Sequence, residues 1–483
     1  MSNSQLPDVL NVKPLNAIQT MNVETNQLDP IVITQNLCRF VLERKGILDV
    51  GSVITMSVHP VDATGDKKCF LPTKTGCHSL VKKALLKVGT KVLATSDMYG
   101  THQTIRRAFK TNEEKSQKDF VKNGTHDVFE PDNAGTGKYQ MKDVIYDATG
   151  AVATIDPSVQ ITLSETECPV FSIRLSELFP MMRNVQLPLY LMNEPVSIEI
   201  TWNAQRDGAA DLGKMLCFQA GFATGGGKTG AKIGLDNVKF LADYLTYEDE
   251  RMSQTAKLVN SATGLVMPYE DMIVTNTNVP AVAPAPAGAA VSTQTITRDL
   301  GLSGRNVRQI LLHDRPQIGG AVVANELMGQ YNSASFNVAS AYNWRVNDQT
   351  VYSREVRLEA RKANQLSHCF GTPINCLAAE YSSDPLTNKQ VANHPITNDV
   401  ISDSTFEGHT MDSISAQMHF EGVDLSTSPL NIPNSGLRVG QKPVEHLRTI
   451  YRTAENNSPR VSTYFSTVER AFVLRNGLVS VSA

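Results

Sequence analysis

The stretch FSIRLSELFPMMRNVQLPLYLMNEPVSIEITWN, residues 171–203, decides the fold class of this chain. Its last part, residues 196–202, alternates apolar and polar side chains with the period of two that predicts a half-buried β-strand. Residues 171–175 alternate in the same way, and residues 185–191 are apolar at every second position, so two further strands are predicted. Between them, Ser176 occupies the position of a helix N-cap, and a proline limits the helix to about one turn. Strand, short helix, strand, turn and strand form a unit of a β-sandwich rather than of an α/β sheet.

Strand patterns continue on both sides of this stretch. The clearest lies at 237–247, where Val238, Phe240, Ala242 and Tyr244 share one face. Other strands are predicted at 31–43, 47–59, 143–165, 265–275, 307–312, 335–338, 344–352, 413–424, 461–474 and 478–481, the last two joined by an Asn-Gly turn. Helices are few and are predicted at 100–121, 248–259 and 355–366, while the first half of 78–96 fits a helix or a strand.

Length and composition set the limits on the class of protein. A chain of 483 residues with 41% hydrophobic and 19% charged residues predicts two or three domains with a sizeable core. The formal net charge of −3 gives no overall basic signature of nucleic-acid binding. No apolar run approaches the ~20 residues of a membrane span. The first residues lack a secretory signal pattern, so we expect the protein to stay in the compartment where it is made.

Several segments, taken in their order along the chain, carry a family resemblance. Besides LSELFP, QLPLYL and EPVSIEITW in the opening stretch, they are ILDVGSVITMS (47–57), VKFLADYLTYEDERMSQTAKLV (238–259), MPYEDMIVT (267–275), TRDLGLSGRNVRQILL (297–312), YNWRVNDQTVYSREV (342–356) and VERAFVLRNGLVSV (468–481). In this order the chain resembles double jelly-roll major capsid proteins, most closely those of polinton-like viruses and virophages. In that comparison, 47–57 corresponds to the first core strand.

The resemblance implies an all-β fold of two tandem eight-stranded jelly-roll sandwiches with short helices and long loops. The expected organisation is an N-terminal arm at 1–30, a first jelly roll at 31–250, a connecting helix or linker at 251–263 and a second jelly roll at 264–483. The arm is polar and aperiodic, and we expect it to become ordered only against a partner. The loops at 278–290 and 380–412 are expected at the outer end or at contacts between trimers.

The function implied by the resemblance is structural rather than enzymatic. Three copies would form a pseudo-hexameric capsomer that tiles the icosahedral shell of a double-stranded DNA virus, so the protein would be found in the virion after assembly inside the host cell. The implied partners are the other two copies of the homotrimer, neighbouring capsomers, and penton and minor capsid or cement proteins. The inner face would contact DNA or an internal membrane.

No catalytic, cofactor-binding or metal-binding residue is predicted. GFATGGGKT (221–229) lacks the first glycine of a phosphate-binding loop, because Phe222 stands in its place. His368, Cys369 and Cys376 are too few for a structural zinc site, and the seven thinly spread cysteines, without a C-x-x-C pair, predict reduced and mostly buried thiols. Asn123 and Asn456 begin glycosylation patterns, which we interpret as coincidental without a secretory signal.

Two basic clusters leave alternatives open. One is Arg354, Arg357 and Arg361 on one side of the predicted helix, and the other is Lys82, Lys83, Lys87 and Lys91. Each cluster either contacts DNA or an acidic neighbouring subunit, or is a solvated face.

The alternative functions are a virion attachment or carbohydrate-binding β-sandwich protein and, in a third class, a metal-dependent jelly-roll enzyme. A carbohydrate site would need exposed aromatic residues, whereas both tryptophans, Trp202 and Trp344, lie in strand patterns that favour the core. The predicted strands offer no cluster of His and Glu for a metal.

Overall fold

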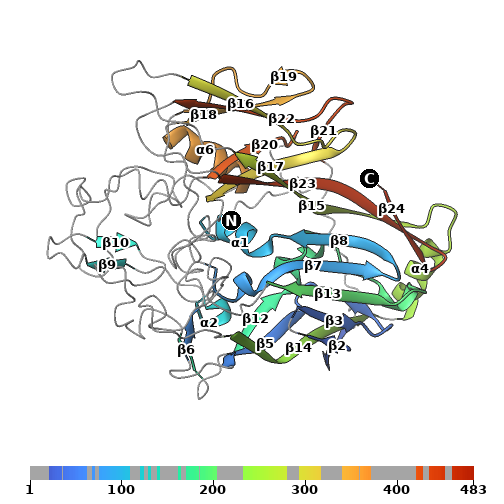
Figure 1. Ribbon diagram of the computed structural model, residues 1–483. Coiled ribbons are helices and arrows are strands. Elements are labelled where there is room, and N and C mark those ends of the chain that lie inside the picture. Colours follow the sequence, from blue (N-terminus) through green and yellow to red (C-terminus); the bar gives the residue numbers. More distant parts are fainter. Residues whose placement is uncertain are drawn as a thin grey trace, which may run out of the picture.

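The computed structural model describes residues 21–34, 36–61, 68–70, 75–108, 120–124, 129–131, 139–141, 162–164, 170–183, 185–203, 232–247, 249–279, 293–316, 340–357, 359–370, 420–427, 435–451 and 460–482. Strands dominate these residues and form stacked sheets (Figure 1). The predicted loops at 278–290 and 380–412, the strand at 335–338 and the glycine-rich segment at 221–229 lie largely or wholly outside them. Among the described helices, none has the length and apolar character needed to cross a membrane.

The first half of the chain forms two sheets. One has the strand order β1 (Met21–Leu28), β14 (Lys232–Tyr247), β5 (Val53–Val61) and β12 (Val170–Arg174), with the short β4 (Ile47–Leu48) added to β14. The other has the order β3 (Leu37–Val41), β13 (Val196–Trp202), β7 (Val81–Val88) and β8 (Lys91–Asp97), with the short β2 (Val32–Ile33) outside β3.

The second half repeats this arrangement. One sheet has the order β15 (Leu265–Val279), β23 (Arg460–Arg475), β17 (Asn306–Pro316) and β20 (Phe420–Asp424), with β24 (Leu478–Ser482) on β23 and β21 (Leu437–Arg438) on β17. The other has the order β16 (Thr293–Asp299), β22 (Glu445–Tyr451), β18 (Ser340–Val346) and β19 (Gln349–Thr350).

The two halves share one topology. If the eight main strands of each half are numbered in chain order, both halves have one sheet ordered 1-8-3-6 and one ordered 2-7-4-5. All neighbouring strands in these sheets are antiparallel. This is the arrangement of an eight-stranded jelly roll, in which two sheets enclose one core. The predicted pair of tandem eight-stranded jelly rolls is confirmed.

Short pieces connect the sheets. The helices are α1 (Tyr99–Ala108), α2 (Phe120–Asn123), α3 (Leu175–Leu178), α4 (Asp249–Val259) and α6 (Glu359–Phe370), with 3-10 turns η1 (Gly76–Leu80), η3 (Pro180–Arg183) and η4 (Leu189–Leu191). Two small two-stranded sheets pair β6 (Lys68–Phe70) with β11 (Thr162–Ser164) and β9 (Phe129–Pro131) with β10 (Tyr139–Met141).

The largest apolar core belongs to both halves. It fills the first jelly roll, where the predicted face of β14 is buried. It also takes in four side chains of the second half, Tyr269, Phe472, Leu474 and Val479. A smaller cluster joins Ile105 of α1 to residues of β15, β17, β23 and α6. The jelly rolls are therefore packed against each other by apolar side chains. Their sheets are stacked in Figure 1.

Two predictions within the opening stretch differ from the structure, and an open alternative nearby is decided. Residues 185–191 form no regular strand: Leu187 makes only an isolated bridge to Leu48, and η4 follows. Pro188 has no N–H to donate, and Leu187 and Leu189 are buried without a strand. Helix α3 begins at Leu175, two residues before the position expected from Ser176 as N-cap. The segment 78–96, whose first half fitted a helix or a strand, forms the end of η1 and then the hairpin of β7 and β8.

The N-terminal arm is also shorter than predicted. Residues 21–28 are not a free arm but the first strand of the first jelly roll, paired with β14 from Met21–Tyr247 to Leu28–Phe240. The strand was hidden because it lies at a sheet edge and its side chains are mostly exposed, so no apolar alternation marks it. Consequently 47–57 supplies the third main strand and not the first. Residues 1–20 lie outside the described residues.

Candidate functional site

The contact between the two jelly rolls joins strand β8 of the first to strand β15 of the second. The Tyr269 hydroxyl donates to the carbonyl of Leu93 at 2.8 Å, and the backbone N–H of Thr95 donates to Asp271 Oδ1 at 3.3 Å. Arg470 donates to the other carboxylate oxygen of Asp271 at 2.7 Å. Burial raises the pKa of Asp271 in spite of this arginine. Side chains of β15 thus satisfy backbone groups of β8 that its own sheet leaves free.

The C-terminal hairpin is anchored on the first jelly roll. Lys91 Nζ donates to the carbonyl of Val479 at 2.6 Å, and the backbone N–H of Asn193 donates to the carbonyl of Gly477 at 2.8 Å. Asn476 and Gly477 both have positive φ, as the predicted Asn-Gly turn requires. A Cβ atom on Gly477 would lie 2.3 Å from Asn193 Nδ2. This turn therefore requires glycine for both its backbone angles and its close contact.

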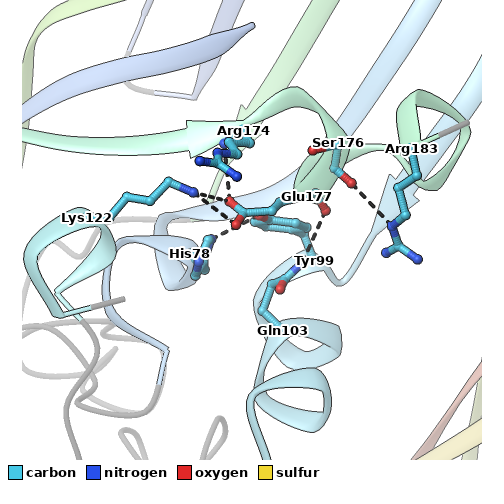
Figure 2. A network of polar contacts seen from close by, with 8 residues as sticks. All are labelled: His78, Tyr99, Gln103, Lys122, Arg174, Ser176, Glu177 and Arg183. Carbon is cyan, nitrogen blue, oxygen red and sulfur yellow. Dashed lines mark hydrogen bonds and ion pairs between the residues drawn. The ribbon is translucent and has the colours of Figure 1, made fainter. Parts of the chain in front are cut away.

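A polar network surrounds helix α3 (Figure 2). Lys122 of α2 contacts both carboxylate oxygens of Glu177, at 2.9 and 3.0 Å. The same carboxylate accepts from the backbone N–H of Arg174 at 3.2 Å, and the backbone carbonyl of Glu177 accepts from Gln103 of α1 at 3.2 Å. Glu177 thus ties three helices together.

Beside Glu177, the buried rings of Tyr99 and His78 join α1 to η1. The Tyr99 hydroxyl lies 2.9 Å from His78 Nδ1, with the rings edge to face. Burial, together with the nearby charge of Glu177, raises the pKa of Tyr99 well above its ordinary value. The phenol therefore stays protonated at neutral pH.

The second jelly roll holds a cluster of charged groups between its two sheets, which we name the core charge cluster. Its members are buried, with at most 3% of each residue exposed, and are Asp314, Glu421, His446, Arg448, Ser462 and Tyr464. Arg448 Nη2 lies 2.7 Å from Asp314 and 3.0 Å from Glu421. His446 lies 2.9 Å from Glu421 through Nε2 and 3.0 Å from the Tyr464 hydroxyl through Nδ1. Ser462 donates to Asp314.

Sequence reasoning missed this cluster, although one signal was available. In EHLRTIY the alternation would place either His446 and Arg448 or Leu447 inside. The structure buries the two polar residues and leaves Leu447 partly exposed. A strand whose polar residues share the core face signals a buried network, because buried charges are kept only with partners.

The basic residues singled out in the sequence are not assembled into a single patch. Helix α6 begins after Arg354 and Arg357, because Val356 is still extended and bridges to Tyr342, so the predicted helical face is wrong. Arg361 donates to the carbonyl of Glu355 and lies over the ring of Tyr352.

The lysine group is divided in the same way. Lys87 pairs with Glu199 and Lys91 is bound to the C-terminal hairpin, whereas Lys82 is exposed.

Other candidates lie apart from one another. His368 is exposed on α6 and Cys369 is partly buried, whereas Cys376 is outside the described residues. Cys38 and Cys77 are buried and form no disulfide, as predicted, and both tryptophans are buried. The side chain of Asn123 is fully buried, which excludes the glycosylation pattern there in the folded chain.

Comparison with known proteins bears on the fold. No protein-family model and no curated protein matches this chain. Solved structures do: one from the Sputnik virophage has a TM-score of 0.57 at 10% identity and covers 100% of this chain and 94% of its own. One from the PBCV-1 virus capsid has 0.56 at 11% identity and covers 98% of both chains. The Faustovirus major capsid protein has 0.52 at 9% identity and covers 96% of this chain and 94% of its own.

These likenesses span both jelly rolls. The fold is that of double jelly-roll major capsid proteins. The similarity to the Sputnik virophage structure agrees with the virophage resemblance of the sequence. At about a tenth of identical residues, the double jelly-roll fold is kept by burial pattern and strand order rather than by particular side chains.

Proposed function

We propose that this double jelly-roll chain is a major capsid protein of a double-stranded DNA virus and acts by assembly, not by catalysis. Three copies form a pseudo-hexameric capsomer, and capsomers tile an icosahedral shell in the virion. The likeness of nearly the whole chain to a viral capsid structure and to a major capsid protein carries this proposal. Neighbouring capsomers, penton and minor capsid or cement proteins are the further partners, and DNA or an internal membrane lies beneath the shell.

The contact within the chain indicates how copies would meet. It joins the fifth main strand of the first jelly roll, β8, to the first main strand of the second, β15. Repeated between copies, the same contact would join β19, the fifth strand of the second jelly roll, to β1 of the next copy. Within the described residues, β19 and β1 each have a sheet partner on one side only. A contact of this head-to-tail kind closes into a three-membered ring when each copy is rotated by a third of a turn from the last, and otherwise gives an open filament.

Exposed apolar side chains lie at both of these edges. Val23 of β1 is 49% exposed and Val351, beside β19, is 36% exposed. Ile31, Val32 and Ile33, which follow β1, are exposed as well. Burial of such side chains against a second copy would stabilise the trimer, at roughly 25 cal/mol per Å² of apolar surface.

The first test is the mass of the purified full-length chain by light scattering, with negative-stain images of the same sample. We expect a trimer of three 52.8 kDa chains with a hexagonal outline. A monodisperse monomer at all concentrations would contradict the capsomer.

Variants at the edges test the proposed contact. Val23→Asp combined with Val351→Asp should shift the mass towards one chain, because a buried unpaired carboxylate is costly. Val170→Asp is the matched control: Val170 is 62% exposed on β12, which lies at the opposite end of its sheet from β1. If the double variant stays trimeric, as the Val170→Asp control should, a different surface joins the copies.

The alternative function, a virion attachment or carbohydrate-binding protein, is less well supported. Such a site stacks sugars on exposed aromatic rings, and the two tryptophans are buried in the two cores. A glycan array with the full-length chain would distinguish the two functions, since a capsid protein of this kind needs no sugar ligand.

A further inference from the structure

The core charge cluster crosses the interior of the second jelly roll from one sheet to the other. Asp314, Glu421 and Tyr464 come from β17, β20 and β23 in one sheet, and His446 and Arg448 come from β22 in the other. Arg448 therefore bridges two carboxylates of the opposite sheet, and His446 bridges a carboxylate and a phenol. In the described part of the first jelly roll, by contrast, no Asp, Glu, Lys or Arg is buried, and the buried histidines His78 and His102 lie in η1 and α1 rather than between its two sheets.

The contacts of His446 suit a neutral ring. A neutral imidazole has one donor and one acceptor nitrogen. With the proton on Nε2, the ring faces Glu421 with a donor, and Nδ1 accepts from the Tyr464 hydroxyl. A second proton on Nδ1 would meet this hydroxyl and force it to turn away. Burial lowers the pKa of His446, although Glu421 partly opposes this.

The other charged and titratable groups around the His446 ring come from β22, β18 and β16. Arg448 lies on the same strand and holds Asp314, and the ring of Tyr342, from β18, lies 6.1 Å from that of His446. Arg298 is opposite His446 in the register of β16 and donates to the carbonyl of Asn278 at 3.0 Å. Two of these neighbours, Arg448 and Arg298, are cations. The ring centroid of His446 lies 4.4 Å from that of Trp344.

We propose that the core charge cluster is a proton-sensitive tie between the two sheets of the second jelly roll, which holds at neutral pH and weakens in acid. The tie belongs to each chain and does not depend on the proposed capsid function. Acid would therefore loosen the sheet of β16, β18, β19 and β22 before it affects the main sheets of the first jelly roll.

The direction in which stability changes with pH follows from proton linkage. His446 has a lower pKa folded than unfolded, so its contribution to stability is complete above the ordinary histidine value of about 6.5. Below that value the opened state binds a proton that the closed state resists. The opening equilibrium then increases by up to about tenfold for each pH unit, until the pKa of the folded state is reached. The range from pH 8 to 5 lies above the ordinary carboxyl values of about 4.

Hydrogen exchange of the full-length chain, read by mass spectrometry between pH 8 and 5 and corrected for intrinsic exchange, tests the tie. We expect peptides from β22 and β18 to lose protection by about tenfold per pH unit below about 6.5. Peptides from β5 and β13 should not change. Equal loss in both jelly rolls, or none in β22, would overturn the proposal.

Variants separate His446 from other groups. His446→Gln keeps a donor and an acceptor but does not titrate, so protection of β22 should become independent of pH in this range. His368→Gln, exposed on α6 of the same jelly roll, is the matched control and should behave as the wild type. His102→Gln is a second comparison, because His102 of α1 is also buried and its pKa is lowered by burial and nearby arginines. If His446→Gln keeps the wild-type pH profile, or if His102→Gln abolishes it, the tie is not at His446.

Tyr464→Phe gives an independent readout should His446→Gln fail to fold. Loss of the hydroxyl removes the donor to Nδ1 and favours the protonated ring. Protection of β22 should then be lower at pH 8 but fall less between pH 8 and 5. An unchanged fall would contradict the proposed role of the ring.

Discussion

Gly76 is held in a conformation that other residues rarely adopt. Its φ is +54°, and a Cβ atom built there would lie 2.2 Å from the backbone carbonyl oxygen of Asn123. That oxygen belongs to helix α2, whose Lys122 contacts Glu177. The absence of a side chain at Gly76 therefore allows α2 to lie close enough to complete the network around α3.

Gly76→Ala should destabilise the chain more than an ordinary glycine substitution. The matched control is Gly301→Ala, where φ is +70° but no atom lies within 4 Å of the new Cβ. Both substitutions cost about 1–2 kcal/mol for the left-handed backbone, and Gly76→Ala adds about 1–3 kcal/mol for the clash. Urea unfolding measures the difference. Equal losses would mean that α2 shifts freely.

Glu177→Ala should lower the free energy of unfolding by about 1–3 kcal/mol, because Lys122 and the Arg174 N–H lose an acceptor in a partly buried place. Glu24→Ala is the comparison. Glu24 pairs with Lys45 at 2.8 Å on the surface, with more than a third of each side chain exposed. Such solvent-screened pairs contribute little to stability, so the loss at Glu24 should be smaller than the loss at Glu177. A larger loss at Glu24 than at Glu177 would contradict this account.

Strand β1 forms one edge of the first jelly roll. It covers the edge of β14 over eight residue pairs, and Thr25 donates to Asp243 at 2.6 Å. Its outer side chains are exposed, so its contribution lies in backbone pairing.

Removal of residues 1–28 should leave β14 with an unpaired edge and give insoluble protein. Removal of residues 1–20 should keep the fold, and it tests whether the remaining predicted arm ties neighbouring copies. Solubility and circular dichroism measure the first effect, and shell assembly measures the second. A soluble, folded chain without β1 would show that the strand is dispensable.

The sequence predicts elements well where burial alternates and poorly where it does not. The alternation in β14 and the Asn-Gly turn before β24 each follow from a local rule, and both are found. Pro188 breaks a strand in which the spacing of leucines looked regular. The core charge cluster brings together residues up to 150 positions apart, from Asp314 to Tyr464, and only strand register sets their distances. No local pattern contains that information.

At the scale of the whole molecule, the two jelly rolls are one packed unit. Phe472 and Leu474 of the second half are fully buried in the core of the first, and Tyr269 and Asp271 are bound to β8. The strands that line this shared core therefore lose stability together, whereas the sheet of β16, β18, β19 and β22 contributes no described residue to it.

Phe472→Ala should therefore destabilise both halves, by about 3–5 kcal/mol. Hydrogen exchange should detect the loss in β7 and β8 as well as in β23. As a control, Val468→Ala removes a side chain from the separate core of the second jelly roll and should affect β23 first. If Phe472→Ala leaves β7 and β8 fully protected, the halves are energetically independent.

The shared core also bears on how the chain is made. A ribosome completes β14 well before it reaches β23 and β24, which cover the first jelly roll from the far end of the sequence. At about 5–20 residues per second, the intervening 235 residues, from Tyr247 to Ser482, take roughly 10–50 s to synthesise. Throughout that interval the nascent first jelly roll has an uncovered apolar wall. Folding of the first jelly roll is therefore complete only after β23 and β24 of the second have been synthesised.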